Sequence, residues 1–408
     1  MVKIQRNEPP FLRIGIAGLG IAGSALLPAI AKHPFVKVTA AFARNKERLA
    51  KFANDYGADV HYSMEDLCSN SNVDAVYIAT PTELHKDHVL IAAEHKKHII
   101  VEKPIATTLE DADTLIKAAY KNGIQLIVGH SQSFEPPIQA IREIIQSGKI
   151  GQLKMVNNWY FNDWIYRPRT AEELDTDLGG GVTYRQGSHQ FDIIRYIGGG
   201  LLRSVRSMAG RWDKNRPTEG AHAAYLEFED GTAATAVYNG YDHFHSTDLT
   251  FGIGEGGPLV TAEEYASSRR MVKQISNLEK EADLKSQAGY GGARAKKYDS
   301  EQIHHPFFGL TIVSCERGDI RQSPNGLFVY GEEEKYEISL QKETGRDVMI
   351  AELYDAVYGI RKSVHDGRWG KANLEVCIAV LESSQQRKEV YLSHQVPVND
   401  SKKMSVVN

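Results

Sequence analysis

Lys103 stands at a position where a lysine could exchange a proton with a small molecule. It stands in the segment Val101-Glu102-Lys103-Pro104, where a predicted strand ends. Ligands of open α/β sheets bind beyond the carboxyl ends of the strands, so a lysine here can hydrogen-bond a hydroxyl or carbonyl group. Burial would lower its pKa and allow proton transfer. From spacing alone, a solvated lysine beside a strand-ending proline is an equally good interpretation.

His189 is a second candidate, within the segment from Gly179 to Asp192. If residues 185–197 form a helix, Arg185, His189 and Asp192 share one face of it, because they lie four and three residues apart. The imidazole could then act as a general acid or base held by Asp192. The alternative is a histidine in a first helical turn that binds a backbone carbonyl.

Aromatic rings and arginines are interleaved between these two positions, from Asn158 to Arg169. Guanidinium groups grip carboxylates through paired hydrogen bonds and rings stack on planar groups, so the segment suits a planar, anionic small molecule. The side chains expected to bind it are Trp164, Tyr166, Arg167 and Arg169. The same composition is typical of a subunit interface, and both interpretations stay open.

A glycine-spaced run predicts what positions these groups. The run Gly18-Leu19-Gly20-Ile21-Ala22-Gly23 follows the apolar segment 12–17 and precedes the helix-compatible stretch 24–33. In a parallel nucleotide-binding sheet, the first glycine permits a tight turn and the second lets the backbone approach a pyrophosphate. The third lets the helix pack on its strand. The order of strand, turn and helix therefore predicts a dinucleotide cofactor.

Short apolar strands alternate with amphipathic helices from residue 12 to residue 129, which is the pattern of stacked βαβ units. The predicted strands are Leu12–Ala17, Val36–Phe42, Ala75–Ala79, His98–Val101 and Gln125–Val128. Apolar residues at helical spacing between them, such as Leu49, Phe52, Ala53 and Tyr56, predict covering helices. We expect an α/β fold whose residues 1–131 form a doubly wound parallel sheet, a Rossmann domain.

A second domain is predicted over residues 132–398, with its boundary near residue 130, where the paired prolines Pro136 and Pro137 then precede another helix. It is strand-rich, with strands expected at 152–160, 202–212, 222–228 and 232–241 and a hairpin turn at Asp230-Gly231. Residues 255–300 form a charged excursion, partly helical around 271–284. Two helices, at 349–364 and 374–388, are expected to pack back onto the first domain, and the tail 399–408 to be disordered.

Composition excludes some partners. A formal charge of -4 over 408 residues gives no electrostatic reason to expect nucleic acid or an anionic membrane surface. The N-terminus lacks the apolar core of a signal peptide, and no run is long and apolar enough to cross a bilayer, so a cytoplasmic protein is expected. Its three distant cysteines are interpreted as reduced thiols.

Two histidine pairs suggest a metal ion, at His243 with His245 and at His304 with His305. Residues 243 and 245 would face the same way in a strand. Neither pair lies in a carboxylate-rich or cysteine pattern, and such pairs are more often ordinary polar residues. No metal is expected.

The motifs at Gly18 to Gly23, Glu102-Lys103-Pro104 and His189 with Asp192, in this order and at these distances, resemble the Gfo/Idh/MocA oxidoreductases. The resemblance spans nearly the whole chain. It implies an N-terminal Rossmann domain and a C-terminal α+β domain whose large, mostly antiparallel open sheet mediates a homodimer or homotetramer. It also implies that Lys103 and His189 are the catalytic residues. The cofactor contacts expected are Gly18, Gly20, Ile21, Ala22, Gly23, Ala43, Arg44, Thr80, Pro81, His85, Glu102 and Lys103.

Two positions depart from that family pattern. Many members have an aspartate four residues before the histidine, where this chain has Arg185, so the substrate should differ from a neutral polyol. An acidic residue that binds the ribose hydroxyls commonly follows the second strand, where this chain has Ala43 and Arg44. A small residue followed by arginine favours a 2′-phosphate, and hence NADP over NAD.

A narrower likeness points to one branch of the family. Residues 166–169, 172–175, His189-Gln190 and 314–321 resemble the branch that contains phthalate 4,5-cis-dihydrodiol dehydrogenase. The resemblance implies an NAD(P)-dependent dehydrogenase of a hydroxylated, carboxylated cyclic substrate, with Lys103 or His189 taking the hydroxyl proton and Arg185 holding carboxylate. Alternatives are a sugar, uronate or inositol dehydrogenase, a glycoside-cleaving relative, and a non-catalytic cofactor-binding regulator.

Overall fold

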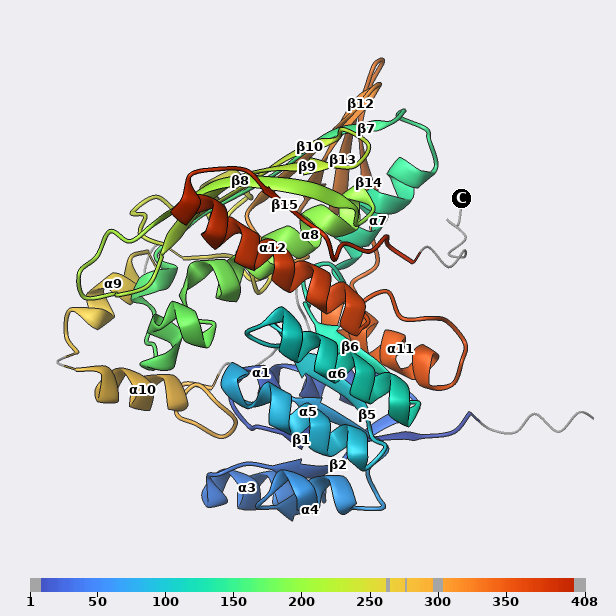
Figure 1. Ribbon diagram of the computed structural model, residues 1–408, viewed down its shortest axis with the longest axis vertical. Helices are drawn as coiled ribbons and strands as arrows, with labels where there is room; N and C mark the ends of the chain where they lie inside the picture. Colours follow the sequence, from blue (N-terminus) through green and yellow to red (C-terminus); the bar gives the residue numbers. More distant parts are fainter. Residues whose placement is uncertain (1–8, 262–264, 276, 296–303, 400–408) are drawn as a thin grey trace, which may run out of the picture.

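The protein contains two β-sheets. The computed structural model in Figure 1 shows the second sheet above the N-terminal one. The structure describes residues 9–261, 265–275, 277–295 and 304–399. Of the tail expected at 399–408, all but the first residue lies outside the described residues. No described helix is long and apolar enough to span a membrane.

The N-terminal sheet has six parallel strands in the order β3-β2-β1-β4-β5-β6, which confirms the Rossmann prediction. Its strands are β1 (Leu12–Ala17), β2 (Val36–Phe42), β3 (Asp59–His61), β4 (Ala75–Ile78), β5 (His98–Glu102) and β6 (Leu126–Gly129). The helices beside it are α1 (Ile21–Ala25), α2 (Leu27–Lys32), α3 (Lys46–Tyr56), α4 (Met64–Ser69), α5 (His85–Glu94) and α6 (Leu109–Asn122). Every residue of β4 and β6 is buried, as expected of strands covered on both faces.

Short polar side chains set the starts of these helices. Asn45 accepts a hydrogen bond from the backbone N–H of Arg48 at 2.9 Å, and Thr108 accepts one from that of Asp111 at 3.1 Å. Gly57 ends α3 in the left-handed conformation, which glycine adopts without strain. The strand β2 therefore passes into α3 within three residues, and this short turn holds Ala43 and Arg44 at the edge of the sheet.

The second sheet has nine strands, in the order β14-β13-β12-β11-β7-β10-β9-β8-β15, and only its β7–β10 pair is parallel. The strands are β7 (Leu153–Phe161), β8 (Leu202–Gly210), β9 (Ala221–Phe228), β10 (Ala233–Asn239), β11 (Leu310–Cys315), β12 (Gly318–Ser323), β13 (Gly326–Gly331), β14 (Lys335–Ser339) and β15 (Val390–Tyr391). The large, mostly antiparallel sheet is thus confirmed, with the predicted hairpin turn at Gly231.

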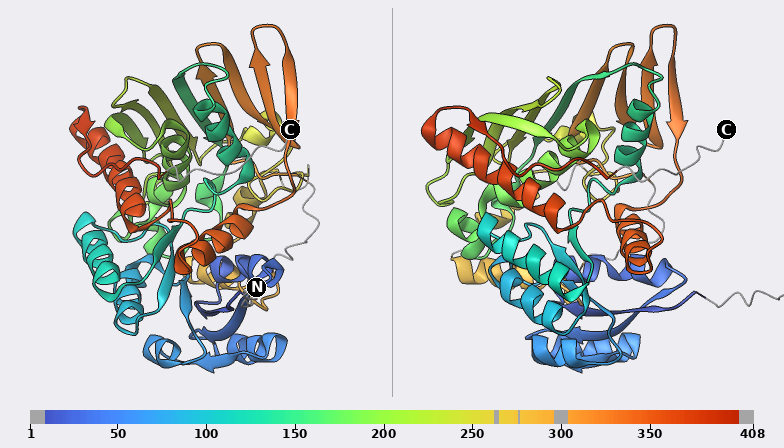
Figure 2. Two further views of the ribbon diagram at one scale, coloured as in Figure 1. Left: turned by 90° about the vertical axis from the view of Figure 1, so that its right-hand side faces the viewer. Right: turned by 45° about the vertical axis from the view of Figure 1, so that its right-hand side comes forward.

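Helices cover one face of this sheet and leave the other open (Figure 2). The covering helices are α7 (Pro136–Gln146), α8 (Ser188–Gly198) and α12 (Gly367–Gln386). On the open face, Met155, Trp159, Met208 and Tyr225 are exposed. The chain returns through α11 (Gly345–Val357), whose apolar face joins the core of β1 and β2, and through α12, which packs on α6. Both helices therefore pack back onto the N-terminal sheet, as predicted.

Several elements differ from the sequence-based expectations. Strand β3, the four strands β11 to β14 and the two-residue strand β15 were not predicted. The helix expected at 185–197 begins as a π-helical turn, Thr183–Gly187, before α8. The excursion at 255–300 contains two short helices in its described part, α9 (Ser267–Val272) and α10 (Leu278–Ser286). Between Gly129 and Pro136 the chain leaves the first sheet, and we propose the boundary between domains 1–131 and 132–398 here.

Candidate active site

The glycine loop has the shape that a dinucleotide requires. Gly18 has a φ of +99°, and a Cβ there would lie 2.7 Å from the carbonyl oxygen of Ala79. A Cβ at Gly23 would lie 1.9 Å from the carbonyl oxygen of Gly18, so the first helix could not pack on its strand. At Gly20 a Cβ would meet no atom within 4 Å, which leaves the backbone open to a ligand. These three glycines fit a bound pyrophosphate.

Next to this loop, Tyr77 joins three segments of the expected cofactor site. Its hydroxyl donates to Glu102 Oε1 at 2.5 Å and lies 3.3 Å from the carbonyl oxygen of Ala22. Glu102 is therefore fixed between β4 and the first helical turn. Just after β2, Ala43 is buried, whereas Arg44 is exposed.

Lys103 directly follows β5, at the edge of the sheet where ligands bind, and its peptide bond to Pro104 is cis. Its Nζ donates a hydrogen bond of 2.6 Å to the main-chain oxygen of Arg185 in the π-helical turn. Burial lowers the pKa of Lys103 to about 8, outweighing the nearby Glu102 carboxylate. Near neutral pH both its protonation states are accessible, which a proton-exchanging residue needs.

His189 lies close to this lysine, and its Nδ1 is 2.8 Å from the main-chain oxygen of His130. A carbonyl oxygen can only accept, so Nδ1 carries the proton and Nε2 keeps its lone pair. Burial, Lys103 and His130 hold the pKa of His189 well below its ordinary value, so the ring is neutral. His189 therefore offers an acceptor nitrogen close to the lysine.

Of the two interpretations of His189, the pairing with Asp192 is wrong and the contact with a backbone carbonyl is confirmed. Asp192 Oδ1 accepts a 2.6 Å hydrogen bond from the indole N–H of Trp369 on α12, and Oδ2 has no partner among the described residues. The carbonyl oxygen at the end of β6 takes the imidazole N–H instead. Asp192 is fully buried and stabilises the packing of α8 on α12.

A cluster of charges lies on the other side of Arg185. Glu173 Oε1 is 3.8 Å from a terminal nitrogen of Arg185, 3.8 Å from one of Arg169, and ion-paired with Lys285 Nζ. Burial would raise the pKa of Glu173, but the three cations outweigh it and lower that pKa to about 2. We call Arg169, Glu173, Arg185 and Lys285 the cation cluster, since it joins three positive groups to one negative group.

The substrate contacts predicted between residues 164 and 169 separate into two groups. Arg169 belongs to the cation cluster, and its guanidinium lies 3.6 Å above the ring of Trp164, which is itself almost fully buried. Arg167 instead pairs with Glu255 at 2.5 Å. The ring of Tyr166 lies under the guanidinium of Arg269, at 4.1 Å. The structure thus brings Arg169 to Arg185 and places Arg167 and Tyr166 against other partners.

His85 is fully buried, so the structure gives it no surface from which to contact a cofactor. Its ring nitrogens lie 2.9 Å from the main-chain oxygen of Pro104 and 3.0 Å from that of Thr80. Burial lowers its pKa to about 4. We therefore propose that His85 positions the Lys103-Pro104 turn against the Thr80-Pro81 turn. Thr80 and Pro81 themselves remain predicted cofactor contacts.

Three residues near this site were missed from the sequence. Glu173 stands in a segment noted only for its branch likeness, and Lys285 in the charged excursion. His130 is buried, and neither of its ring nitrogens has a partner among the described residues. Lys285 and His130 reach the site through contacts between segments distant in sequence, so spacing gave no signal for them. Glu173 lies four residues after Arg169, and this i, i+4 spacing of opposite charges is a signal that could have found it.

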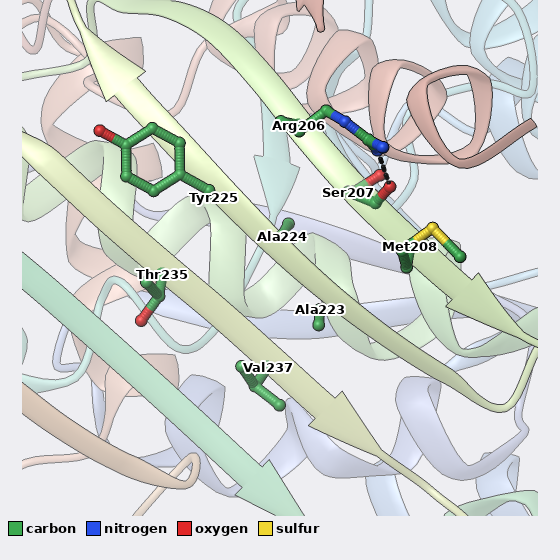
Figure 3. Close-up of a pocket in the computed structure, with 8 residues that line it drawn as sticks. All are labelled: Arg206, Ser207, Met208, Ala223, Ala224, Tyr225, Thr235 and Val237. Carbon is green, nitrogen blue, oxygen red and sulfur yellow. Dashed lines mark hydrogen bonds between the residues drawn. The ribbon is translucent and has the colours of Figure 1, made fainter. Parts of the chain in front are cut away.

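The described residues contain no group of three or more histidine, cysteine or acidic side chains that could hold a metal ion. His243 and His245 follow the end of β10 at Asn239, so they do not share a strand face as considered. A shallow hollow lies elsewhere, on the open face of the second sheet (Figure 3). Its lining residues are Arg206, Ser207, Met208, Ala223, Ala224, Tyr225, Thr235 and Val237. No histidine, lysine or carboxylate lines this hollow, in contrast to the surroundings of Lys103.

Comparison with known proteins assigns both parts of the chain. Residues 12–130 match the family model described as oxidoreductase family, NAD-binding Rossmann fold, and residues 138–257 match the GFO/IDH/MocA C-terminal domain. A 1-carboxy-3-chloro-3,4-dihydroxycyclohexa-1,5-diene dehydrogenase from Comamonas testosteroni is 38% identical over 92% of this chain and 95% of its own.

Solved structures agree with this assignment. A structure from Bordetella bronchiseptica RB50 is 41% identical, with a TM-score of 0.88, over 93% of this chain and all of that one. The WlbA dehydrogenase from Bordetella pertussis, solved with NADH and UDP-GlcNAcA, has a TM-score of 0.70 over 95% of this chain and 99% of its own. At 18% identity that likeness concerns the fold alone. The chain is an NAD-binding oxidoreductase of the Gfo/Idh/MocA family.

Proposed function

We propose that this protein oxidises a carboxylated, cyclic cis-diol to its aromatic diol, with phthalate 4,5-cis-dihydrodiol as the first candidate. The cation cluster carries this proposal. It is joined to Lys103 through Arg185, whose main-chain oxygen binds the lysine while its guanidinium faces Glu173. One carboxylate beside three cations leaves positive charge that an anionic substrate can neutralise.

The unpaired donors of the cluster support this interpretation. Nε of Arg169 and Nε of Arg185 are buried and without a partner among the described residues. Burial lowers the pKa of Arg169 to about 10, so its charge is held at a cost in free energy. A substrate carboxylate would supply acceptors in this region. The Comamonas testosteroni relative, named for a carboxylated dihydroxycyclohexadiene, is consistent with such a substrate.

In this reaction the protein takes up one proton, that of the substrate hydroxyl group. The nicotinamide of the bound dinucleotide supplies the hydride acceptor for the carbinol carbon. Neutral Lys103 Nζ takes the hydroxyl proton as the carbon–oxygen double bond forms, since a pKa of about 8 leaves part of the lysine uncharged at neutral pH. His189 Nε2 accepts a hydrogen bond from the neighbouring hydroxyl and orients the ring. The resulting hydroxydienone tautomerises to the aromatic diol, which drives the reaction forward.

NADP is the proposed cofactor. Arg44 is exposed just beyond β2 and has no ion pair with any residue that the structure describes, so it can bind a 2′-phosphate. Ala43 offers no carboxylate to accept hydrogen bonds from free ribose hydroxyls or to repel that phosphate.

A homodimer or homotetramer is proposed to form through the open face of the second sheet. Tyr225 and Met208 are about half exposed there, at 49% and 54%, and Trp159 is exposed on β7, which lies beyond β10 in the same sheet. Exposed aromatic and methionine side chains on one flat face are typical of interfaces. Changing Tyr225 to Glu should lower the mass measured by light scattering. An unchanged mass would assign the interface to another surface.

The function is tested by following reduced-nicotinamide absorbance with a matched panel: phthalate 4,5-cis-dihydrodiol, the unsubstituted cis-dihydrodiol, glucuronate, glucose and myo-inositol, each with NADP and with NAD. Faster reduction with the carboxylated diol supports the proposal. Preference for glucuronate would indicate a uronate dehydrogenase, and preference for the neutral polyols would contradict an acidic substrate. Tight NADPH binding without turnover on any of them would favour a regulator.

A further inference from the structure

A short segment of the charged excursion, residues 281–290, contacts both the cation cluster and the glycine loop. At one end, Glu281 Oε2 accepts hydrogen bonds from the backbone N–H of Arg169 at 3.1 Å and from Arg216 at 2.9 Å. At the other end, the backbone N–H of Tyr290 donates to the main-chain oxygen of Leu19 at 3.1 Å. Figure 1 shows α10 beside α1, between the N-terminal sheet and the loops of the second sheet. The segment therefore joins the cation cluster to the glycine loop.

At the cluster, Lys285 is the cation that α10 contributes. It ion-pairs with Glu173, whose side chain also faces Arg169 and Arg185. A structural ion pair needs only one cation for one carboxylate, and each additional buried charge costs free energy unless it is compensated. Lys285 is the cation paired most closely with Glu173, but its ammonium carries three N–H donors, so it can keep that pair and still donate to a second anion. Its side chain is 28% exposed, so an incoming carboxylate can reach it.

At the glycine loop, the segment fits closely against the backbone. A Cβ placed on Gly289 would lie 2.9 Å from the main-chain oxygen of Leu19 and 3.3 Å from Gly20 Cα. The ring of Tyr290 packs edge-on against Phe52 of α3, with centroids 5.2 Å apart. Arg48, also on α3, donates to Ser286 Oγ at 2.9 Å. The segment thus contacts the loop that binds the pyrophosphate and the helix beside the expected adenosine.

The segment between these two ends is held by its own hydrogen bonds. The helix α10 continues into turns. In these turns the backbone N–H of Ala288 donates to the main-chain oxygen of Lys285 at 3.0 Å, and the backbone N–H of Gly289 donates to that of Ser286 at 3.0 Å. Lys285 is therefore only four residues from the contact with the loop, along a hydrogen-bonded chain. A change in the loop's position is expected to move the Lys285 ammonium relative to Glu173.

We propose that Lys285 is a ligand of the substrate carboxylate and that residues 281–290 couple it to the glycine loop, so that the dinucleotide and the acidic substrate bind cooperatively. The proposal rests on the acidic substrate proposed above. A dinucleotide that orders Gly18 to Gly20 also fixes the backbone against which Gly289 and Tyr290 pack. It thereby fixes the position of Lys285. Such coupling is reciprocal: each ligand tightens the other by the same factor, typically about 5- to 150-fold.

The role of Lys285 is tested with phthalate, a carboxylate ligand that cannot be oxidised, and its uncharged dimethyl ester, by calorimetry on the NADPH-loaded protein. Lys285→Met should weaken phthalate binding about 10- to 100-fold, as expected for one charge-assisted hydrogen bond. Binding of the ester should be unchanged. Lys280→Met is the matched control, because Lys280 is exposed on the same helix and the charge change is identical. Equal phthalate affinity in the two variants would overturn the proposal.

The coupling is tested with Gly289→Ala, whose added methyl pushes the segment from Leu19. Phthalate should tighten NADPH binding at least about fivefold in the wild-type protein and less than about twofold in this variant. Tight NADPH binding that is equally sensitive to phthalate in both would contradict the coupling.

The two levels of the proposal fail differently. If the wild-type protein binds phthalate no better than its ester, the acidic substrate itself is wrong. If it prefers phthalate and Lys285→Met keeps that preference, only the inference about the segment is wrong. Melting temperatures of all variants identify any loss that comes from unfolding.

Discussion

Lys103 Nζ and the main-chain oxygen of Arg185 are joined by a hydrogen bond of 2.6 Å between β5 and the π-helical turn before α8. This bond fixes the ammonium of the proposed base relative to the guanidinium of the proposed carboxylate ligand. It uses a backbone atom of Arg185, so the position of Lys103 does not depend on that side chain. Substitutions at the two residues should therefore change different kinetic constants.

Lys103→Met should lower kcat about 100- to 10,000-fold, the usual contribution of a positioned proton acceptor. Methionine has a similar length but no titratable nitrogen. NADPH affinity, measured by the fluorescence of the bound cofactor, should stay within about threefold of the wild-type value. A variant that keeps its kcat would contradict a role for Lys103 in proton transfer.

The pH dependence of diol oxidation should follow the same lysine. Burial lowers the pKa of Lys103 to about 8, and only its neutral form can accept a proton. The rate constant kcat/KM should rise with pH and level off above about 8, and the reverse reduction should fall over the same range. His189 is neutral throughout, because its pKa lies well below 6.5, so it adds no second transition near neutral pH. The initial rates are to be measured from pH 6 to 10 with saturating NADP. A flat profile would assign the proton to another group.

Arg185→Ala should raise KM for the carboxylated diol about 10- to 100-fold and change kcat by less than about fivefold. The backbone contact with Lys103 survives this substitution, whereas the guanidinium is lost. Arg167→Ala is the matched control, because Arg167 pairs with Glu255 outside the cation cluster. Steady-state kinetics of both variants decide the question, and equal effects on KM would remove Arg185 from substrate binding.

The parts of this site that the sequence predicted correctly depend on local order. The run from Gly18 to Gly23 specifies a strand, a tight turn and a helix within a few residues, and Lys103 directly follows a strand whose apolar pattern is continuous. Both signals come from neighbouring residues, so they are visible without the fold. The strands of the N-terminal sheet were accordingly placed to within about a residue, except for the three-residue β3.

The parts that were missed depend on contacts between distant segments. Glu173 gains its role from Lys285, which arrives on a short helix of the excursion, and Asp192 takes its partner Trp369 from the last helix. The open faces of β12 and β14 carry Asp319, Arg321, Lys335 and Glu337, which weakens the apolar pattern of a buried strand. Neither the partners nor these strands could be inferred from spacing alone.

Arg44→Ala should raise KM for NADP about 10- to 100-fold and leave KM for NAD within about twofold. Only NADP carries the 2′-phosphate that the exposed guanidinium can bind. Lys46→Ala, an exposed cation two residues further on, is the control for a general loss of positive charge. If Arg44→Ala affects both cofactors equally, the expected preference for NADP loses its structural basis.

Glu135, at the start of α7, should make stability depend on pH. Its side chain is almost fully buried, and burial raises its pKa to about 8, against the opposing effect of Arg346. Its Oε2 has no partner among the described residues. The unfolded chain releases this proton near the ordinary pKa of 4.5, so the folded state binds one more proton between there and about 8.

Stability should therefore fall as pH rises through that window, by on the order of a few kcal/mol from this group. Glu135→Gln keeps the shape of the side chain and carries no charge, so it should lose this dependence. Relative to the wild-type protein, the variant should gain stability steadily from pH 5 to pH 8.5. Urea unfolding at several pH values measures the difference. A constant difference between the two proteins would mean that Glu135 is already ionised in the folded state, with a partner for its second oxygen.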